Sequence, residues 1–285
     1  MSLDISNFYQ SFIEIANIVK VQEKNINIIA NNILIKNMLN YSQIVGYISQ
    51  ECENLIQTKE FFSSLNNYII AFNSIDGLDN FKSNITVGTI YALYNYDPET
   101  DNIISIVESG YCLYGSKTLL VRAKNNLVEQ FYLDDKNNFI KQKNLSFEDN
   151  KERLYAINQS NRYCSEIDSL ILNYRINKYN QRWIGCMVAD CHQILTRGGI
   201  FLYPSSERRP DGKLKLLYQI LPMANIFRSA GGIGLDASYK DILDNVYNFK
   251  IMEKDIHKSM SIIFCSNEEH RRLVDFFNIT ESIYC

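Results

Sequence analysis

The sequence of 285 residues lacks an excess of positive charge, a long hydrophobic run and any closely paired cysteines. Its 29 Lys and Arg against 32 Asp and Glu give a net charge of -3, which argues against nucleic-acid binding. No apolar run approaches membrane-spanning length, and the N-terminus has no secretory-signal pattern, so we expect no membrane partner. The seven cysteines are scattered without a CxxC motif. We therefore expect reduced thiols and a cytoplasmic protein.

Hydrophobic periodicity predicts two helices followed by a mainly antiparallel sheet in the first half of the chain. The helices are expected over 5–20 and 27–39. The strands are expected at 44–48, 68–72 and 85–94, within 103–124, and in a hairpin formed by 130–133 and 138–141. The polar segment SQECEN at 49–54 has the composition of a solvated loop.

Helices and strands are expected to alternate in the second half, which favours a layered α/β arrangement. Helices are expected over 166–178, 187–196, 214–230 and 267–277, and strands at 154–158, 200–203, around Gly234 and at 261–265. The charged segment KQKNLSFEDNKER at 141–153 is the candidate boundary between the two halves of the chain. The expected domains are therefore 1–145 and 146–285.

The stretch YIIAFNSIDGLDN at 68–80 joins a buried strand to a polar turn. The apolar run Tyr68–Phe72 predicts the strand, and Gly77 predicts the turn. Asp76 and Asp79 would then lie at the carboxyl end of the strand, where α/β proteins usually hold their chemistry. On the residues alone, these two aspartates are a candidate acid pair.

Two segments of the second half are the most distinctive: RWIGCMVADCHQILTRGGIFLYP at 182–204 and GKLKLLYQILPM at 212–223. They resemble the class I fructose-1,6-bisphosphatases, and the resemblance extends in one collinear order from about Ile26 to His257. It implies a mixed α+β layered sandwich, the sugar-phosphatase fold. It also implies an N-terminal domain of the allosteric type, a C-terminal domain that binds sugar phosphate, and a homo-oligomer, either dimer or tetramer. The segment that binds the inhibitor AMP in the family has no match here.

The resemblance also implies a set of substrate-binding residues. The family holds its sugar phosphate with an Asn, several Tyr, a Lys and an Arg that reaches across from a neighbouring subunit. The matching positions are Asn158, Arg182, Trp183, Tyr203 and Lys213. The implied ligand is fructose 1,6-bisphosphate or fructose 6-phosphate.

The residues at the family's metal-binding positions depart from its pattern. In the family, carboxylates at these positions bind Mg²⁺. Glu51 and Asp76 remain as acids, and the resemblance implies catalytic and metal-ligand roles for them. Four other acidic positions of the pattern carry amides here: Gln50, Asn73, Gln219 and Asn32. Mg²⁺ needs anionic oxygen ligands in near-octahedral geometry, and an amide brings no charge. Binding of Mg²⁺ is therefore doubtful on the sequence.

The phosphate-binding serines of the family's turn are also replaced, by Leu78 and Asp79. Three readings follow. In the first, hydrolysis is lost or strongly impaired, and a sugar-phosphate pocket persists in a pseudoenzyme. In the second, an active Mg²⁺-dependent phosphatase of gluconeogenesis uses a site rebuilt from Glu51, Asp76, Asp79 and Glu53. In the third, the chain is a non-catalytic scaffold subunit that pairs with an active paralogue. Compositional drift after catalysis ceased to matter would also produce these amides.

Overall fold

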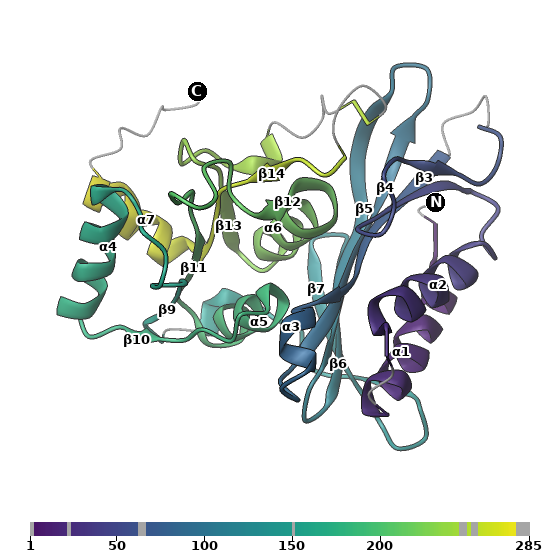
Figure 1. The fold of residues 1–285 in the computed structure, drawn as a ribbon, viewed down its shortest axis with the longest axis horizontal. Coiled ribbons are helices and arrows are strands. Elements are labelled where there is room, and N and C mark those ends of the chain that lie inside the picture. The colour runs from purple at the N-terminus through teal and green to yellow at the C-terminus, as the bar shows by residue number, and fades with distance from the viewer. Residues whose placement is uncertain are drawn as a thin grey trace.

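Two β-sheets with a pair of helices between them form the middle of the molecule in the computed structural model (Figure 1). The structure describes residues 3–21, 24–61, 67–149, 152–244, 250–251 and 256–277. Within this part of the chain, no helix has the length and apolar character needed to cross a membrane.

The larger sheet has eight strands in the order β2-β1-β3-β4-β5-β6-β7-β8. Strands β1 and β3 are parallel, and every other neighbouring pair is antiparallel, which confirms the predicted mainly antiparallel sheet. The strands are β1 (Ile44–Ser49), β2 (Ile56–Gln57), β3 (Asn67–Asp76), β4 (Val87–Asp97), β5 (Asn102–Tyr114), β6 (Thr118–Lys124), β7 (Leu127–Leu133) and β8 (Phe139–Lys141).

The smaller sheet has five strands in the order β10-β9-β11-β15-β13. Its strands are β9 (Leu154–Ala156), β10 (Asn180–Gln181), β11 (Ile200–Tyr203), β13 (Gly232–Leu235) and β15 (Ile262–Ser266). A separate two-stranded ribbon pairs β12 (Leu214–Lys215) with β14 (Ser259–Met260). This ribbon lies beside the cavity described below.

The helices form three layers around the two sheets (Figure 1). The outer layer on the larger sheet consists of α1 (Gln10–Lys20) and α2 (Ile26–Met38), preceded by the 3-10 turn η1 (Ser6–Tyr9). Helices α5 (Met187–Arg197) and α6 (Leu221–Ser229) lie between the sheets, and α4 (Ser165–Ile176) and α7 (Asn267–Phe277) cover the far face of the smaller one. Short helical turns are α3 (Leu78–Phe81), η2 (Phe147–Asp149) and η3 (Leu216–Ile220).

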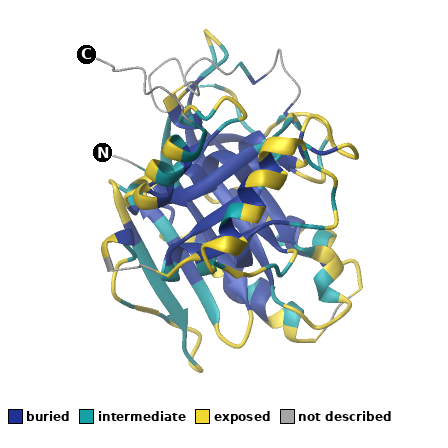
Figure 2. Ribbon diagram, turned by 90° about the vertical axis from the view of Figure 1, so that its left-hand side faces the viewer, coloured by how far each residue is buried: buried dark blue, intermediate teal, exposed yellow. Residues whose placement is uncertain are grey.

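Three hydrophobic cores correspond to these layers. Phe12 and Ala16 of α1 pack with β3 in one core, and Ile167 and Leu170 of α4 pack in another against the smaller sheet. The third and largest core joins both sheets through α5 and α6. The strands and middle helices are accordingly the most buried part of the molecule (Figure 2). Burial of each large apolar side chain contributes about 1.5–3 kcal/mol, so the layers are held mainly by this packing.

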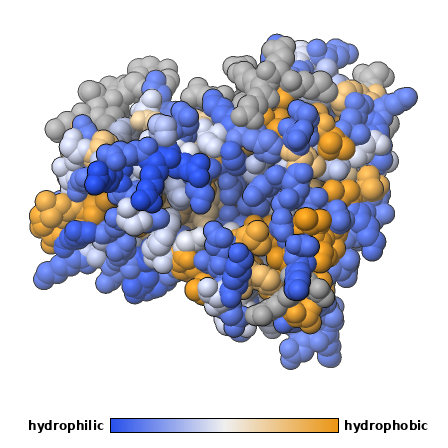
Figure 3. Space-filling view, in the orientation of Figure 1, coloured by the Kyte–Doolittle hydropathy of each residue, from blue (hydrophilic) through white to orange (hydrophobic). Residues whose placement is uncertain are grey.

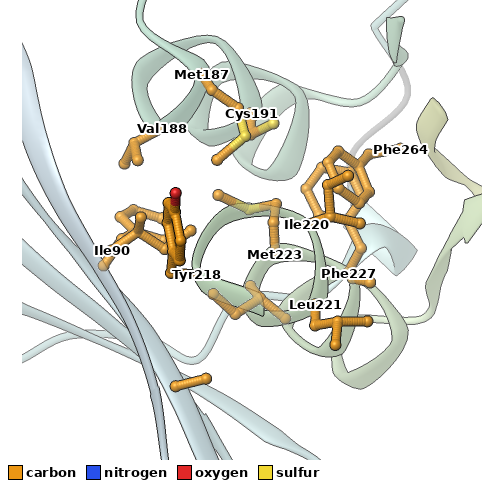
Figure 4. Close-up of a cluster of buried hydrophobic side chains, with 14 of the residues drawn as sticks. Ile90, Met187, Val188, Cys191, Tyr218, Ile220, Leu221, Met223, Phe227 and Phe264 are labelled. Atoms are coloured by element: carbon orange, nitrogen blue, oxygen red, sulfur yellow. The ribbon is translucent and has the colours of Figure 1, made fainter. Parts of the chain in front are cut away.

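Figure 4 shows the middle of the largest core, where side chains of α5 and α6 point toward one another. Met187 and Cys191 come from α5, and Met223 and Phe227 come from α6. All four are buried. The packing fixes the N-terminal end of α5 close to the end of β3, and this contact positions the candidate site.

The surface that covers these layers is mostly hydrophilic on the face drawn in Figure 3, with hydrophobic side chains in separate small groups. On α4, Leu172 and Ile176 are both more than half exposed. They stand four residues apart and therefore share one face of the helix.

The helix predicted over 214–230 is the main difference from the expected elements. Leu214 and Lys215 instead pair with β14, the π-helical turn η3 follows, and α6 begins only at Leu221. The pairing partners of β12 lie more than forty residues away, so local periodicity does not reveal them. The other elements expected in the described residues are present within a few residues of their predicted bounds.

Candidate functional site

The turn that follows β3 is closely packed against the beginning of α5. Asp76 is the last residue of β3, and Gly77 has a left-handed φ of 78° before α3 begins. A Cβ on Gly77 would lie 2.7 Å from the Cβ of Cys186. Only glycine fits this position, because it accepts both the φ and the contact.

Asp76 is 6% exposed and accepts hydrogen bonds from several donors of its own chain. Its Oδ1 accepts from Gln219 Nε2 at 3.0 Å and from Asn73 Nδ2 at 3.3 Å. Its Oδ2 accepts from the backbone N of Val188 at 3.0 Å and from the thiol of Cys186 at 3.2 Å. The carboxylate is therefore tied to β3, η3 and α5 at once.

Two of these donors are amides at positions where the family pattern has a carboxylate. Carboxylates at Asn73 and Gln219 would place like charges beside Asp76, and such a group needs cations to be stable. The amides remove that repulsion and donate hydrogen bonds in its place. The same oxygens of Asp76 that a metal ion would use are thus already engaged by protein donors.

Gln219 is directed at Asp76 by the π-helical turn η3. Its Oε1 accepts a hydrogen bond from the backbone N of Lys215 at 2.9 Å, and its Nε2 donates to Asp76. Both ends of the amide are therefore satisfied, as a buried amide requires. A π-helical turn often marks a functional position, because its extra residue re-aims a side chain.

These residues do not fit a two-metal centre. Among the residues that the structure describes, no group of three or more His, Cys, Asp or Glu could hold a metal ion. Glu51, the second surviving acid, is exposed, and its Oε1 accepts a hydrogen bond from Asn27 Nδ2 at 3.0 Å. Glu51 is not part of the cavity that Asp76 lines.

A cavity of about 730 Å³ opens beside Asp76. It brings together most of the residues expected for the site: Gln50, Asn73, Asp76, Leu78, Asp79, Asn158, Trp183, Tyr203, Lys213 and Gln219. Its two ends differ in chemistry. The end formed by β3, α3 and η3 carries the acids and amides, and the end formed by β11 and the loop before β12 carries aromatic rings and cations.

Aromatic rings form the wall of the second end. Trp183, Phe201 and Tyr203 lie with their ring centroids 6.1–6.4 Å apart. Burial raises the pKa of Tyr203, nearby Arg209 lowers it, and Asp76 raises it again. Both Arg209 and Asp76 are therefore near enough to Tyr203 to influence its pKa.

The cations of this end are Arg209 and Lys213, and both side chains are exposed. Within the described part of the chain neither is held in an ion pair. Asn158 lies beside them in the lining, where its Oδ1 accepts hydrogen bonds from the backbone N and the hydroxyl of Ser160. Such a set of unpaired cations suits an anionic ligand group.

Arg182 does not reach the cavity of its own chain. Its side chain is exposed and donates a hydrogen bond to the carbonyl of Gln181 at 3.1 Å. Trp183, the next residue, does line the cavity. Adjacent residues thus point in different directions at this position.

A second buried carboxylate holds the loop that carries Trp183. Asp190 on α5 accepts from the backbone N of Ile184 at 2.7 Å and of Gly185 at 3.1 Å. Burial raises the pKa of Asp190 to about 7, against the lowering effect of these two hydrogen bonds. The residue supports the site without lining it.

Three polar residues of the lining were not expected from the sequence: Arg209, Lys215 and His257. Lys215 Nζ donates to the carbonyl of His257 and to the hydroxyl of Ser259. The cluster Arg208-Arg209 close before Lys213 was a possible signal for Arg209. His257 comes from a distant part of the chain, and no local pattern points to it.

Comparison with known proteins agrees with this geometry. The family models "Fructose-1-6-bisphosphatase, N-terminal domain" and "Fructose-1-6-bisphosphatase, C-terminal domain" match residues 11–144 and 148–278. The class 1 fructose-1,6-bisphosphatase of Neisseria meningitidis serogroup A is 34% identical, over 92% of this chain and 82% of that protein. The chain belongs to the class 1 fructose-1,6-bisphosphatase family.

Other members of the fructose-1,6-bisphosphatase family are similarly related. Fructose-1,6-bisphosphatase 1 of Rattus norvegicus is 32% identical, over 92% of this chain and 74% of that protein. The crystal structure of Leishmania major fructose-1,6-bisphosphatase in holo form matches with a TM-score of 0.82 at 27% identity, over 95% of this chain and 92% of that one. The predicted family and layered fold are confirmed.

Proposed function

We propose that this class 1 fructose-1,6-bisphosphatase family member binds a sugar phosphate and has lost most or all metal-dependent hydrolysis. The observation that carries the proposal is the hydrogen bonding of Asp76, whose Oδ1 accepts from the amides of Gln219 and Asn73. Bound Mg²⁺ ions supply a hydroxide nucleophile and neutralise charge on the transferring phosphoryl group. In this proposal the amides make Asp76 a hydrogen-bond acceptor that stabilises the fold, and Asp76 no longer serves as a metal ligand.

The turn after Asp76 supports the same proposal. Leu78 and Asp79 line the cavity where the family pattern has two serines. Leu78 offers no hydroxyl to a phosphate, and Asp79 places a negative charge there. Loss of a single preorganised electrostatic group typically lowers a rate by about 10²–10³, and these changes affect several groups.

The cationic end of the cavity supports retained binding. Asn158, Trp183, Tyr203 and Lys213 line it together, with Arg209 added. Their proposed role is to hold the phosphate and the sugar ring. Because Asp76 is satisfied by protein donors, the pocket needs no metal ion to keep its shape.

The test is a phosphate-release assay with fructose 1,6-bisphosphate in Mg²⁺ and in Mn²⁺, on the wild type and on Asp76→Asn. We expect no release above background in either protein. Metal-dependent release by the wild type that Asp76→Asn abolishes would establish an active enzyme with a rebuilt metal site and overturn the proposal. Absence of both release and ligand binding would leave the scaffold role.

Arg182 supports a proposed homo-oligomer, a dimer or tetramer. The side chain is exposed and lies outside its own cavity, so in an oligomer it is available to a neighbouring cavity. Light scattering of the full chain at micromolar concentration tests this, and a monomer would contradict it. The proposed domains remain 1–145 and 146–285, since the larger sheet ends at Lys141 and the smaller begins at Leu154.

A further inference from the structure

The two ends of the cavity carry opposite charge. Asp76 and Asp79 lie at the end formed by β3 and α3, and Arg209 and Lys213 lie at the other end. Asp79 is exposed and stands in the first turn of α3, at the surface of the cavity. A ligand that fills the cavity therefore meets cations at one end and carboxylates at the other.

The acidic end offers little to a phosphate. Its one nearby cation is Lys215, whose Nζ already donates to the carbonyl of His257 at 2.8 Å and to Ser259 Oγ at 2.9 Å. The amide of Gln219 donates one N–H to Asp76, and its oxygen accepts from the backbone N of Lys215. Leu78 is 39% exposed and adds an apolar surface. A second phosphate at this end would face two carboxylates, those of Asp76 and Asp79, against the one ammonium of Lys215.

The same end suits neutral hydroxyl groups. A carboxylate accepts hydrogen bonds from hydroxyl donors and, when unpaired, is satisfied by two or more of them. Within the described structure the carboxylate of Asp79 has no hydrogen-bond or ion-pair partner, and it is free to accept from a ligand hydroxyl. The apolar side chain of Leu78 can lie against the carbon face of a sugar.

From this charge arrangement we infer that the cavity selects a sugar monophosphate over a bisphosphate, and that Asp79 is the residue that determines this specificity. The phosphate lies at Arg209 and Lys213, and the unphosphorylated end of the sugar lies at Leu78 and Asp79. The inference rests on the proposed function, since it assumes binding without a metal ion. It adds that the ligand is a sugar monophosphate and that Asp79 disfavours a bisphosphate.

Calorimetric titration in buffer containing EDTA tests the inference, with fructose 6-phosphate and fructose 1,6-bisphosphate as the two probes. Repulsion between the Asp79 carboxylate and a second phosphate dianion a few ångströms away in water is expected to give about a thirtyfold preference for the monophosphate. Asp79→Asn removes the charge at constant shape and is expected to bring the two affinities within about twofold of each other.

Two further variants control the experiment. Asp168→Asn removes an exposed charge on α4 outside the cavity, and it is expected to keep the preference. Lys213→Met is expected to weaken both ligands by more than about tenfold, because charge-assisted hydrogen bonds to phosphate are among the strongest. Lys240→Met, at an exposed lysine outside the lining, controls for the loss of a cation.

The inference is overturned if the bisphosphate binds as tightly as the monophosphate to the wild type, if Asp79→Asn leaves the ratio unchanged, or if neither ligand binds. Metal-dependent phosphate release is a separate outcome. It would overturn the proposed loss of hydrolysis, and the affinity ratio measured in EDTA would still decide the specificity of the cavity.

Discussion

The two ends of the cavity keep different properties of the family pattern. At the cationic end, formed by β11 and the loop before β12 and called the sugar-phosphate end from here on, Lys213 and Tyr203 keep the residue types of the family, and Trp183 keeps an aromatic ring. At the acidic end, formed by β3, α3 and η3 and called the metal end from here on, Asn73 and Gln219 have nearly the volume of the family's carboxylates but not their charge. Asn73 and Gln219 thus keep the shape of the family's residues without their charge, whereas Lys213 keeps both.

This difference has a physical origin in what holds each end together. Packing against α5 and η3 constrains the size of the residues around Asp76, because buried side chains fit closely. Their charge has no such constraint once no metal ion must be bound, since amides are more stable than clustered carboxylates without a cation. Under the proposed loss of metal binding, the hydrogen bonds from Asn73 and Gln219 to Asp76 stabilise this end in place of metal ions.

The largest expected effect comes from a change in the shape of the metal end. Gly77→Ala introduces a Cβ 2.7 Å from Cys186 Cβ at a φ of 78°. The strain and the overpacking together should lower the free energy of unfolding by about 3 kcal/mol, as measured by urea denaturation. Gly231→Ala is the matched control, because its φ is 84° with no heavy atom within 4 Å of the new Cβ. Equal effects of the two would show that the turn is not closely packed.

A somewhat smaller effect is expected from removing the charge that the metal end retains. Asp76→Ala leaves the donors of Gln219, Asn73 and Val188 without their acceptor. Each unsatisfied buried donor costs about 1–3 kcal/mol, and removal of a buried charge offsets part of this, so we expect a net loss of about 2 kcal/mol in urea denaturation with EDTA present. A gain in stability would mean that Asp76 is an unneutralised ligand carboxylate.

The effect that is smallest for each step of the experiment, one pH unit, concerns Asp190, the buried carboxylate that holds the loop of Trp183. Burial raises its pKa to about 7 from the ordinary 3.8. Its contribution to stability is full below pH 3.8 and is lost as the pH rises from 3.8 through 7, by about 1.4 kcal/mol per pH unit. The difference in unfolding free energy between wild type and Asp190→Asn should change with this slope from pH 5 to about 7 and level off between pH 7 and 8. A difference independent of pH would contradict the raised pKa.

Much of the fold follows from local patterns in the sequence. The buried run Tyr68–Phe72 and the turn at Gly77 were predictable, because a short apolar run that ends in glycine has few alternatives. Helix α5 has a clear C-terminal boundary for a similar reason, because Gly198 and Gly199 follow it. The pairing of β12 with β14 and the π-helical turn after it were not predictable, since both depend on contacts between distant segments.

The candidate site was only partly predictable. The residue types at Asn73, Asp76 and Gln219 indicated a changed metal end, but their hydrogen bonds depend on rotamers that a sequence does not specify. Glu51 and Arg182 were expected at the site by their place in the family pattern. Both side chains are exposed and outside the cavity of this chain, so their proposed roles stay predictions.

Titration of Mg²⁺ by calorimetry is the most direct test of whether amides have replaced metal binding at Asp76. The wild type is compared with the triple variant Gln50→Glu, Asn73→Asp, Gln219→Glu, which restores the acids of the family pattern. We predict no Mg²⁺ binding to the wild type below millimolar concentrations and clear binding to the variant, since Mg²⁺ needs anionic oxygens. Binding to the wild type at micromolar concentrations, lost in Asp76→Asn, would contradict the account.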